Sequence, residues 1–451
     1  LEDMPTIDVE NAWGLDATSL GNHEFDYGID RLKAHIDRAD FPFLASNVVE
    51  TATGKIPGWL DGASRVFTVN GIKVGVIGAE LEETPELVSA GATAGLSFLD
   101  EGPRIKAESQ RLRAKGVKVQ VVVIHQGTAN GRNAIGNAAG QTWDGPILAI
   151  ADQLQDTTID AMFVGHTHRI SNLQYGKFPI LEGLNAGASY SVGQFLIRNG
   201  DVAWVGGATR VAKNLGVTGR ADVKAIVDDA NAQTAVLRNK VIGTQSIDIK
   251  RAPTRLFESA MGNMVADAMR EKYPSVDAAF TNSGGLRADL NLIPPSAGEQ
   301  PGEITWGEMF AVLPFGNRTV IETITGAQLA AAFTNGFLPA CNAAFTGGTG
   351  RFPQVSGIRV AYRCDAALLP VIDGMWKTPT GIGGPETAIG PTDTIRIVTN
   401  DFMFGGGDGY SALTGGTNVL QPGDDLLQVA IDFVAAHSPV APAVQGRIIK
   451  N

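Results

Sequence analysis

The chain has few cysteines, no long apolar run and little positive charge, and each of these scarcities argues against a class of protein. Only two of its 451 residues are cysteines, Cys341 and Cys364, and they bracket a Gly-rich segment of the second half. They either form a disulfide, as in an oxidising compartment, or remain two separate buried thiols. The longest apolar runs, such as residues 121–124, are far shorter than the roughly 18–20 residues that a membrane span requires, so we expect no transmembrane segment.

Positive charge is also in short supply. The chain has 36 Lys and Arg residues against 47 Asp and Glu residues, which gives a formal net charge of −11. Because a polyanion needs a basic surface, this balance argues against nucleic-acid polymers as partners and favours a small substrate. A Walker-type P-loop is excluded as well, since no Gly-Lys-Ser or Gly-Lys-Thr follows the three glycines at 405–407.

The overall composition is that of an ordinary globular protein. With 44% hydrophobic and 18% charged residues the chain has ample material for a core, and its 451 residues suggest two to three domains. Neither a fibrous nor a disordered class is indicated. The one compositionally biased segment is the Gly/Pro-rich stretch 378–391, which we expect to be a surface loop.

The six histidines are distributed unevenly. Five lie in the first 170 residues; His23, His125, His166 and His168 each follow a short apolar, strand-like stretch, whereas His35 lies in a polar helical pattern. One histidine after a strand is usually a hydrogen-bonded loop residue. Four such histidines indicate a metal site, because neutral imidazole is the commonest transition-metal ligand. The segment 21–26, Gly-Asn-His-Glu-Phe-Asp, adds an amide and two carboxylates, which suggests metal-assisted hydrolysis.

Five motifs, in this order, resemble the secreted or periplasmic 5′-nucleotidases, which include UDP-sugar hydrolases and cyclic-nucleotide phosphodiesterases. They are GNHEFDYG at 21–28, GHTH at 165–168, TNSGGLR at 281–287, LPFGN at 313–317 and FMFGGGDGY at 402–410. The first two alone are typical of the broad calcineurin-like metallophosphoesterases. The other three are specific for the two-domain nucleotidases, and the resemblance covers nearly the whole chain.

The resemblance implies a centre with two divalent metal ions, whether Zn, Mn, Co, Mg or Ca. Asn22, His125 and His166 match the ligands of one ion, and His168 matches a ligand of the other. The family's Asp-x-His and Gly-Asp, expected before residue 21, do not occur here, so the bridging carboxylate is missing. We therefore expect an N-terminally incomplete sequence, rather than a true pseudoenzyme, that binds at most one metal ion weakly.

The resemblance also assigns the catalytic groups. In the complete enzyme the metal ions lower the pKa of a bound water that attacks phosphorus. His23 resembles the catalytic histidine, which supports the transition-state charge and can donate a proton. Asp26 is expected to accept the other ring N–H of His23 and to fix the ring orientation. Without the resemblance, Asp26 would be interpreted as an ordinary helix N-cap.

The second half matches the family's nucleotide pocket. Arg255 and Arg287 correspond to arginines that grip the phosphate end, where a planar guanidinium binds oxygens bidentately. Phe315 and Phe402 correspond to the pair that sandwiches the base, and such stacking is worth roughly 1–3 kcal/mol by truncation. Taken singly, each arginine is more often a solvated surface residue and each phenylalanine a core residue.

Three polar residues complete the predicted pocket. Asp408 follows the glycines at 405–407, which let the backbone approach a ligand closely, and in the family this Asp accepts hydrogen bonds from the ribose hydroxyls. Asn282 and Asn317 match polar residues near the base or ribose, although an Asn beside a Gly is very often a turn residue.

Helix and strand patterns alternate along residues 1–205, which indicates an α/β layered domain. Expected helices cover 6–14, 28–39, 104–115 and 146–155, and expected strands cover 17–20, 43–47, 66–69, 72–77, 119–124 and 161–164. The resemblance implies a metallophosphoesterase sandwich of two facing sheets flanked by helices, incomplete here. Loss of the first strands is expected to expose a sheet edge and to promote aggregation.

Residues 221–240 place apolar side chains at three- and four-residue spacing, which predicts one helix. We interpret 219–240 as a linker between a metallophosphoesterase domain at 1–218 and an α+β nucleotide-binding domain at 241–451. Catalysis is expected to depend on domain closure about this linker. In the second domain the expected helices cover 259–272 and 325–336, and the expected strands cover 278–281, 319–323 and 394–398.

Together these patterns predict a two-domain, extracytoplasmic phosphohydrolase that releases phosphate from nucleoside 5′-monophosphates. A 2′,3′-cyclic-nucleotide phosphodiesterase, a 3′-nucleotidase or a UDP-sugar hydrolase would share the motifs. Outside the enzyme class, the alternative is a nucleoside-binding protein that has lost its metals. The preferred base and the oligomeric state stay open.

Overall fold

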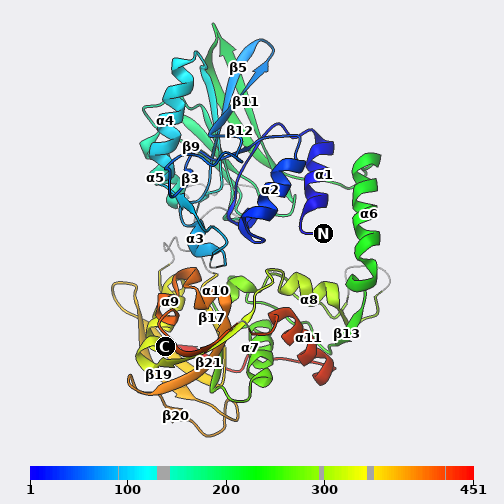
Figure 1. Ribbon diagram of the computed structural model, residues 1–451, viewed down its shortest axis with the longest axis vertical. Coiled ribbons are helices and arrows are strands. Elements are labelled where there is room, and N and C mark those ends of the chain that lie inside the picture. The colour runs from blue at the N-terminus through cyan, green and yellow to red at the C-terminus, as the bar shows by residue number, and fades with distance from the viewer. Residues whose placement is uncertain (90, 129–142, 294–298, 343–349, 422) are drawn as a thin grey trace. The chain divides into compact units, whose positions relative to one another are not determined.

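The computed structural model describes residues 1–89, 91–128, 143–293, 299–342, 350–421 and 423–451. The chain divides into two compact units, Leu1–Asn231 and Ala232–Asn451. Helix α6 (Ala221–Arg238) confirms the helix that was expected at 221–240 (Figure 1). The division between the units falls inside this helix. The linker at 219–240 and the domain bounds stay predictions.

The first unit is built on a six-stranded sheet with the strand order β4-β5-β7-β8-β10-β9. The pairs β5–β7, β7–β8 and β8–β10 are parallel, and the two edge strands run antiparallel to their neighbours. The carboxyl ends of the parallel strands therefore lie at one edge, where α/β sheets commonly bind ligands. The strands are β4 (Ser64–Val69), β5 (Ile72–Ala79), β7 (Val119–Ile124), β8 (Ala161–Val164), β9 (Ser171–Tyr175) and β10 (Phe178–Glu182).

Helices α4 (Glu101–Ala114) and α5 (Pro146–Gln153) lie side by side and bury their apolar side chains against this sheet (Figure 1). A second core surrounds the segment that carries Asn22 and His23, and it contains Leu20, Phe25 and Leu32. Further elements of this unit are α1 (Met4–Trp13), β1 (Thr18–Ser19), the 3-10 helix η1 (Asn22–Phe25), α2 (Ile29–Arg38), β2 (Phe43–Leu44), β3 (Val48–Glu50), α3 (Thr84–Leu87), β6 (Leu96–Phe98) and the paired strands β11 (Ser189–Arg198) and β12 (Asp201–Val211).

Each helix and strand expected in the first unit is present. The bounds of β7 and β8 agree to the residue, because both strands are short, apolar runs that are largely buried. The strand expected at 43–47 is shorter, and helix α1 begins two residues earlier than expected. Gly14 ends that helix in a left-handed conformation with φ 76°, for which glycine is suited.

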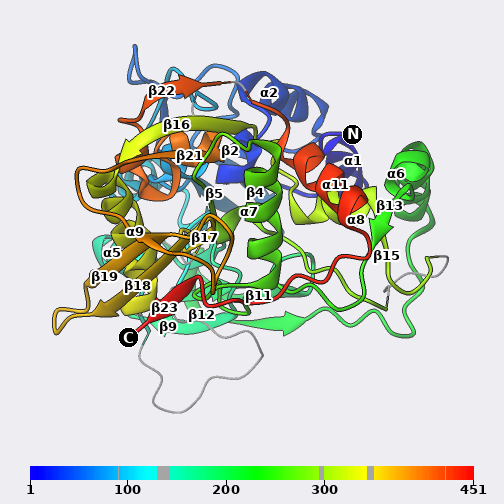
Figure 2. The same cartoon turned by 90° about the horizontal axis from the view of Figure 1, so that it is seen from below.

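The second unit contains a five-stranded sheet, β17-β14-β21-β16-β22, and a four-stranded sheet, β20-β19-β18-β23. Alternate residues of the five-stranded sheet enter different cores: Ala279 and Val398 pack with α7 and α11, whereas Phe280 and Ile397 pack with α9 and the four-stranded sheet. Figure 2 shows α9 beside β18 and β19.

The strands of these two sheets are β14 (Ala278–Asn282), β16 (Thr319–Thr325), β17 (Pro353–Ser356), β18 (Ile358–Cys364), β19 (Pro370–Lys377), β20 (Thr387–Ala388), β21 (Thr394–Asn400), β22 (Thr417–Leu420) and β23 (Ile448–Lys450). The helices are α7 (Ala260–Lys272), α8 (Trp306–Val312), α9 (Gly326–Cys341), α10 (Asp401–Phe404) and α11 (Leu426–His437), and strands β13 (Val241–Thr244) and β15 (Glu303–Thr305) form a separate pair.

The expected helices and strands of this unit are confirmed. Ser259 and Thr325 cap α7 and α9, since their hydroxyls accept hydrogen bonds from the N–H groups of Gly262 and Gln328. Helix α9 runs on to Cys341, five residues beyond its expected end. The Gly/Pro-rich stretch 378–391 is a mostly exposed loop that contains only the short β20.

Cys341 and Cys364 form a disulfide with an S–S distance of 2.03 Å, so the bonded alternative is confirmed. The bond joins the end of α9 to the end of β18. Among the helices described, none is both long and apolar enough to cross a bilayer.

Candidate functional site

Three of the predicted metal ligands meet at the carboxyl ends of the parallel strands. His125 follows β7 directly, and His166 follows β8 after one glycine. His125 Nε2 lies 2.9 Å from Asn22 Oδ1 and 3.3 Å from His166 Nδ1. The amide of Asn22 comes from η1, 103 residues away in the sequence. The fold therefore assembles this cluster from three separate loops.

The geometry of the cluster fits one metal ion. Ligand atoms about 2.1 Å from a shared ion at tetrahedral or octahedral angles are roughly 3.0–3.4 Å apart, and the two measured separations are 2.9 Å and 3.3 Å. Burial, followed by the nearby His166, His23 and His168, lowers the pKa of His125 to about 3. His125 is thus neutral at physiological pH, which is the form that binds metals.

The fourth predicted ligand, His168, is exposed and lies two residues beyond His166. Across the described residues, no group of three or more His, Cys, Asp and Glu side chains is arranged to hold a metal ion. The cluster at the strand ends consists of two imidazoles and the amide of Asn22. A role for His168 at a second ion, and the expected limit of one weakly bound ion, stay predictions.

The two predicted catalytic residues are in contact. His23 Nδ1 lies 2.8 Å from Asp26 Oδ2, and the His23 side chain is 47% exposed. The alternative interpretation of Asp26 as a helix N-cap is wrong, because α2 starts at Ile29 and its capping residue is Gly28. The carboxylate instead contacts the ring of His23 and can orient it. The catalytic role of the pair stays a prediction.

A half-buried carboxylate shapes the turn that presents Asn22 and His23. Glu24 Oε2 accepts a hydrogen bond of 2.6 Å from the N–H of Gly21. A Cβ on Gly21 would lie 2.8 Å from that oxygen and 2.9 Å from His125 Nδ1, so a larger residue does not fit. Burial raises the pKa of Glu24 to about 7, and the N–H of Gly21 opposes the shift. Sequence reasoning assigned no role to Glu24.

In the second unit, the predicted phosphate-binding arginines belong to one cationic cluster. Burial, followed by the positive charges of Arg287 and Arg251, lowers the pKa of Arg255 to about 10. The guanidinium carbon of Arg287 lies 5.4 Å from the ring centre of Phe315. Because like charges repel, an anion bound among these side chains would relieve the repulsion. Arg251, bonded to Asp289 at 3.0 Å, was missed by sequence reasoning.

The predicted ribose-binding residues lie together as well. Asp408 Oδ2 accepts a 2.8 Å hydrogen bond from Asn282 Nδ2, and Asn282 Oδ1 accepts one of 3.2 Å from Asn400 Nδ2. Burial raises the pKa of Asp408, whereas Asn282 and then Arg351 lower it. The sequence analysis did not find Asn400 and Arg351, because the residues of this group that they affect, Asn282 and Asp408, lie far away in the sequence.

The remaining predicted residues, Phe402, Phe315 and Asn317, lie on or beside short loops of the same unit. Asn317 Nδ2 donates a 2.9 Å hydrogen bond to Asp401 Oδ1, next to Phe402 in α10. Both phenylalanines are half-buried, and the ring of Phe402 leaves no room for a Cβ on Gly407. Their stacking on a base stays a prediction.

Gln354 joins two of these segments, although sequence reasoning overlooked it. Its Oε1 accepts from the N–H of Ser259 at 3.0 Å, and its Nε2 donates to Phe257 O at 2.9 Å and to Ser283 Oγ at 3.0 Å. The loop after Arg255 is thereby tied to the loop after Asn282. No local signal marks this role, because β17 mixes two polar residues with two apolar ones.

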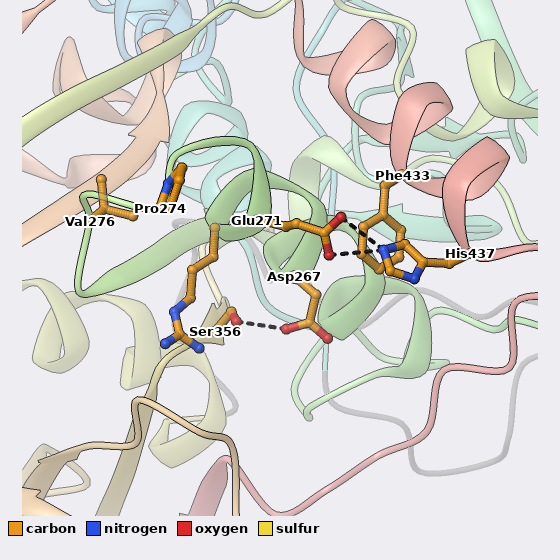
Figure 3. Close-up of a pocket in the computed structure, with 8 residues that line it drawn as sticks. Asp267, Glu271, Pro274, Val276, Ser356, Phe433 and His437 are labelled. Carbon is orange, nitrogen blue, oxygen red and sulfur yellow. Dashed lines mark hydrogen bonds and ion pairs between the residues drawn. The ribbon is translucent and has the colours of Figure 1, made fainter.

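The second unit also has a cavity of about 530 Å³ between α7 and α11, which none of the predicted site residues lines (Figure 3). The charged groups of its lining have partners in the chain: His437 Nε2 lies 2.8 Å from Glu271 Oε1, Asp267 accepts from Ser356 Oγ at 2.6 Å, and Arg270 donates to Pro379 O at 2.7 Å. These pairs explain the charged lining without a ligand.

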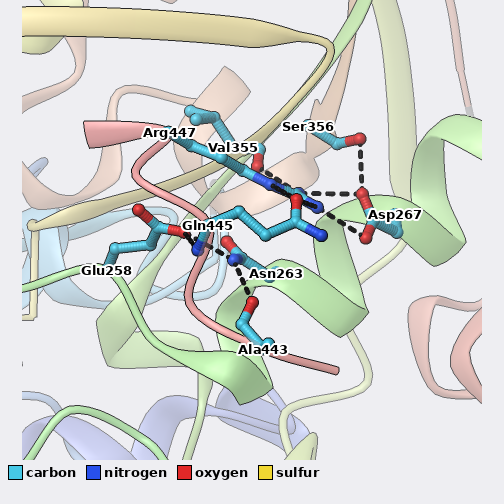
Figure 4. A network of polar contacts seen from close by, with 8 residues as sticks. All are labelled: Glu258, Asn263, Asp267, Val355, Ser356, Ala443, Gln445 and Arg447. Carbon is cyan, nitrogen blue, oxygen red and sulfur yellow. Dashed lines mark hydrogen bonds and ion pairs between the residues drawn. The ribbon is translucent and has the colours of Figure 1, made fainter. Parts of the chain in front are cut away.

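Beside this cavity, Arg447 anchors the C-terminal segment to α7 (Figure 4). It donates to the two oxygens of Asp267 at 2.8 and 2.7 Å and to Val355 O at 2.7 Å. Glu258 accepts from Asn263 Nδ2 at 2.6 Å and from the N–H of Gln445 at 2.7 Å. These hydrogen bonds join the C-terminal segment to α7 and to Glu258, so the network is a structural clamp.

Comparisons with known proteins agree with this arrangement. Residues 235–415 match the family described as 5′-nucleotidase, C-terminal domain. The chain is 30% identical over 452 residues to the cell wall protein Lmo0130 of Listeria monocytogenes, covering 91% of this chain but 55% of that protein, so it spans about half the length of this relative. It is 26% identical over 481 residues to the snake venom 5′-nucleotidase of Gloydius brevicauda, covering 97% of this chain and 75% of that protein.

Among solved structures, a 5′-nucleotidase precursor from Thermus thermophilus is similar with a TM-score of 0.81 at 23% identity, covering 99% of this chain and 86% of that one. This likeness concerns the fold. It confirms the expected class, an α/β phosphoesterase unit followed by a mixed α and β C-terminal domain.

Proposed function

We propose that the chain is a nucleotide phosphoesterase of the 5′-nucleotidase family, as the family match of residues 235–415 and the likeness to a snake venom 5′-nucleotidase indicate, and that it hydrolyses nucleoside 5′-monophosphates to a nucleoside and phosphate with the aid of a divalent metal ion. The observation that carries this proposal is the convergence of Asn22, His125 and His166, whose ligand atoms are separated by 2.9 and 3.3 Å. Such a cluster suits a metal ion.

The atoms that meet are of a kind that binds metal ions. The amide oxygen of Asn22 is an acceptor, and a neutral imidazole has one nitrogen with a free lone pair. His125 Nε2 lies within 3.3 Å of both the Asn22 oxygen and His166 Nδ1. A shared cation would attract all three lone pairs.

A bound metal ion would supply an activated water and neutralise charge on the phosphoryl oxygens. Within the chain, His23 stabilises the charge that develops in the transition state and donates a proton toward the leaving oxygen. Asp26 holds the His23 ring through its 2.8 Å contact at Nδ1. Because the His23 side chain is 47% exposed, a substrate can reach it.

The second unit would bind the nucleotide. Arg255 and Arg287 attract the phosphate, because their mutual repulsion is relieved by an anion. Phe315 and Phe402 stack on the base. Asp408, held at 2.8 Å by Asn282, accepts hydrogen bonds from the ribose hydroxyls.

An extracytoplasmic location belongs to the same proposal. The disulfide between Cys341 and Cys364 is typical of oxidising compartments, and one relative is named a cell wall protein. The cyclic-nucleotide phosphodiesterase, 3′-nucleotidase and UDP-sugar hydrolase alternatives differ from the proposal in the phosphoester that is cleaved.

One observation favours a second candidate, a nucleoside-binding protein without turnover. Within the described part of the chain, no set of three His, Cys, Asp or Glu side chains forms a metal site. The arginine, asparagine and aspartate contacts of the second unit do not depend on such a site. Adenosine binding in a metal-free solution, with no hydrolysis of any phosphoester, would support this candidate.

Product release from AMP, 2′,3′-cyclic AMP and UDP-glucose in the presence of Mn²⁺ tests the proposal. We expect impaired, slow hydrolysis of AMP, since the bridging carboxylate is missing from this sequence, and loss of that hydrolysis in His125→Ala. His437→Ala is the matched control at an exposed histidine of the second unit. Hydrolysis that is unchanged in His125→Ala would contradict the metal role. Cleavage of only one of the other two substrates would replace the proposed substrate class.

Calorimetric titration with Mn²⁺ or Zn²⁺ tests the metal cluster directly. We expect one weak site that disappears in Asn22→Ala, because the amide is one of three ligands. Asn418→Ala, at an exposed asparagine of β22, is the control and should leave the titration unchanged. Two tight sites on this chain would refute the expected stoichiometry.

A further inference from the structure

One buried carboxylate lies between the two loops that carry the clustered histidines. Glu182 is the last residue of β10, pairs with Val164 of β8 and is fully buried. Its two oxygens face different loops. Oε2 is directed to the loop that follows His125, and Oε1 to the loop that contains His166 and His168.

The contacts on the first side involve Thr128 and Ser171. The N–H and hydroxyl of Thr128 lie 3.3 and 3.4 Å from Glu182 Oε2, and Ser171 Oγ lies 3.3 Å from the same oxygen. The two hydroxyls are themselves 2.6 Å apart. All three residues are fully buried, so water does not compete for the hydrogen bonds between them.

The contacts on the second side hold the turn at 165–169. Glu182 Oε1 accepts from Thr167 Oγ1 at 2.5 Å and from the N–H of Arg169 at 3.3 Å. The N–H of Thr167 donates to Gly165 O at 2.8 Å. The hydroxyl of Thr167 thus fixes the residue that stands between His166 and His168.

This turn is strained, which is why it needs such an anchor. His166 and His168 have φ angles of 71° and 55°, in the left-handed region that non-glycine residues adopt uncommonly. Thr167 is the residue between the two. A persistent strained turn requires contacts that hold it in place, and those of Thr167 and Arg169 with Glu182 serve this purpose.

The two loops are also packed too tightly to shift independently. A Cβ on Gly127 would lie 2.5 Å from Thr167 Oγ1 and 2.8 Å from Glu182 Oε1, and it would also collide with Gly165 O. The backbone after His125 therefore rests directly on the turn that contains His166. The Glu182 carboxylate sits at this junction and bonds to both sides.

We propose that Glu182, acting through the hydroxyl of Thr167, is a positioning residue that sets the distance between the imidazoles of His125 and His166. It touches neither ring and is not a catalytic residue. The inference rests on the proposed function only where it concerns metal binding; the positioning of the rings is independent of it.

The test uses Thr167→Val, which keeps the shape of the side chain but removes the donor to Glu182, and Thr167→Ser, which restores a hydroxyl. Loss of an outer contact of this kind typically weakens metal binding about 10- to 100-fold. We expect the affinity for Mn²⁺ to fall by about tenfold in Thr167→Val and to return to within about twofold of the parent in Thr167→Ser.

The matched control is Thr157→Val, which removes a half-buried threonine hydroxyl bonded to Leu154 O at 2.7 Å in the same unit. A general loss of stability would weaken Mn²⁺ binding in both valine variants, whereas positioning affects only Thr167→Val. If Thr167→Val does not fold, Thr167→Ala removes the same hydroxyl without placing an apolar methyl against the carboxylate.

A second measurement does not depend on metal binding. Crystal structures of the parent and Thr167→Val should show that the separation of His125 Nε2 and His166 Nδ1 departs from 3.3 Å in the variant. An unchanged separation, or an unchanged Mn²⁺ affinity in a variant whose parent binds Mn²⁺, would overturn the positioning role. If the parent binds no Mn²⁺ but the two rings move apart or together in Thr167→Val, the proposed function is refuted and the positioning role is supported.

Discussion

His23 Nδ1 and Asp26 Oδ2 lie 2.8 Å apart at the end of the 3-10 helix η1. The His23 side chain is 47% exposed and that of Asp26 is 19% exposed, so water competes for this contact. An exposed pair of this kind is worth about 1 kcal/mol or less. The carboxylate therefore orients the ring without contributing much to the stability of the fold.

We predict that Asp26→Asn lowers kcat for AMP by about fivefold or less, because the ring loses an anionic partner worth at most about 1 kcal/mol. His23→Ala should cost about 100-fold or more, as expected when a general acid is removed. Steady-state kinetics measure both. Asp30→Asn, at a fully exposed carboxylate of α2, is the control and should leave kcat unchanged. Equal losses in Asp26→Asn and His23→Ala would show that Asp26 does more than orient the ring.

The second prediction concerns Gln354, which is fully buried and bonded to Ser259, Phe257 and Ser283. In Gln354→Leu several buried polar groups lose their partner, so the free energy of unfolding should fall by about 2–4 kcal/mol. Because the loops after Arg255 and Asn282 lose their common anchor, adenosine should bind more weakly. Urea denaturation and calorimetric adenosine binding measure the two effects.

The control for this change is Gln428→Leu, at an exposed glutamine of α11 that bonds to Asp432. It should alter the free energy of unfolding by no more than about 0.5 kcal/mol. If Gln354→Leu were destabilised but bound adenosine as the parent does, Gln354 would support the fold without organising the pocket.

The third prediction is a pH dependence that originates at Glu322. This carboxyl is fully buried in β16, and among the described residues neither of its oxygens has a hydrogen-bond partner. Burial raises its pKa from 4.5 in the unfolded chain to about 8. The folded state therefore binds the proton more tightly, so the contribution of Glu322 to stability is most favourable below pH 4.5 and declines as the pH rises to 8.

Glu322→Gln should remove this decline, because an amide stays neutral. Scanning calorimetry at about pH 8.5 should show a higher melting temperature for Glu322→Gln than for the parent, with a smaller difference at about pH 5. Glu303→Gln, at a half-buried carboxyl of β15, is the control and should follow the parent at both pH values. If the melting temperatures of the parent and Glu322→Gln differed by the same amount at the two pH values, the pH dependence would not originate at Glu322.

The fourth prediction concerns the disulfide between Cys341 and Cys364, which are 23 residues apart. Closing a loop of that size stabilises a protein by about 3 kcal/mol. Dithiothreitol should therefore lower the melting temperature of the second unit by about 6–12 °C. The double variant Cys341→Ala/Cys364→Ala should melt near the reduced parent and should not respond to dithiothreitol. A response of the double variant would point to a different cause.

Local sequence patterns predicted most of the helices and strands, and the reasons can be seen in particular segments. Strands β7 and β8 are apolar runs because they lie inside a parallel sheet, so their bounds follow from composition. The helices expected from residues 259 and 325 begin within one residue of those positions, because the caps Ser259 and Thr325 need only their own hydroxyl and the next turn. Asp26 shows the limit of such reasoning, since a cap and a partner for His23 were equally compatible with the local pattern.

The positioning residues escaped prediction because their partners are distant in sequence. Glu182 meets Thr128 across 54 residues, and Gln354 meets Ser259 across 95. Nothing in the neighbouring residues indicates such contacts. The state of Cys341 and Cys364 also stayed open until the ends of α9 and β18 were found side by side.

The amino-acid sequence alone determined which chemical groups are available. They are the histidines and the asparagine of the metal cluster, the arginines, and the aromatic residues. Short-range periodicity placed each of them at the end of a strand or on a loop. The tertiary structure decided which of them meet. Asn22 and His125 approach to 2.9 Å because β1 and β7 end near each other in the first unit. Such a meeting depends on strand pairing and packing between distant segments, which no local pattern encodes.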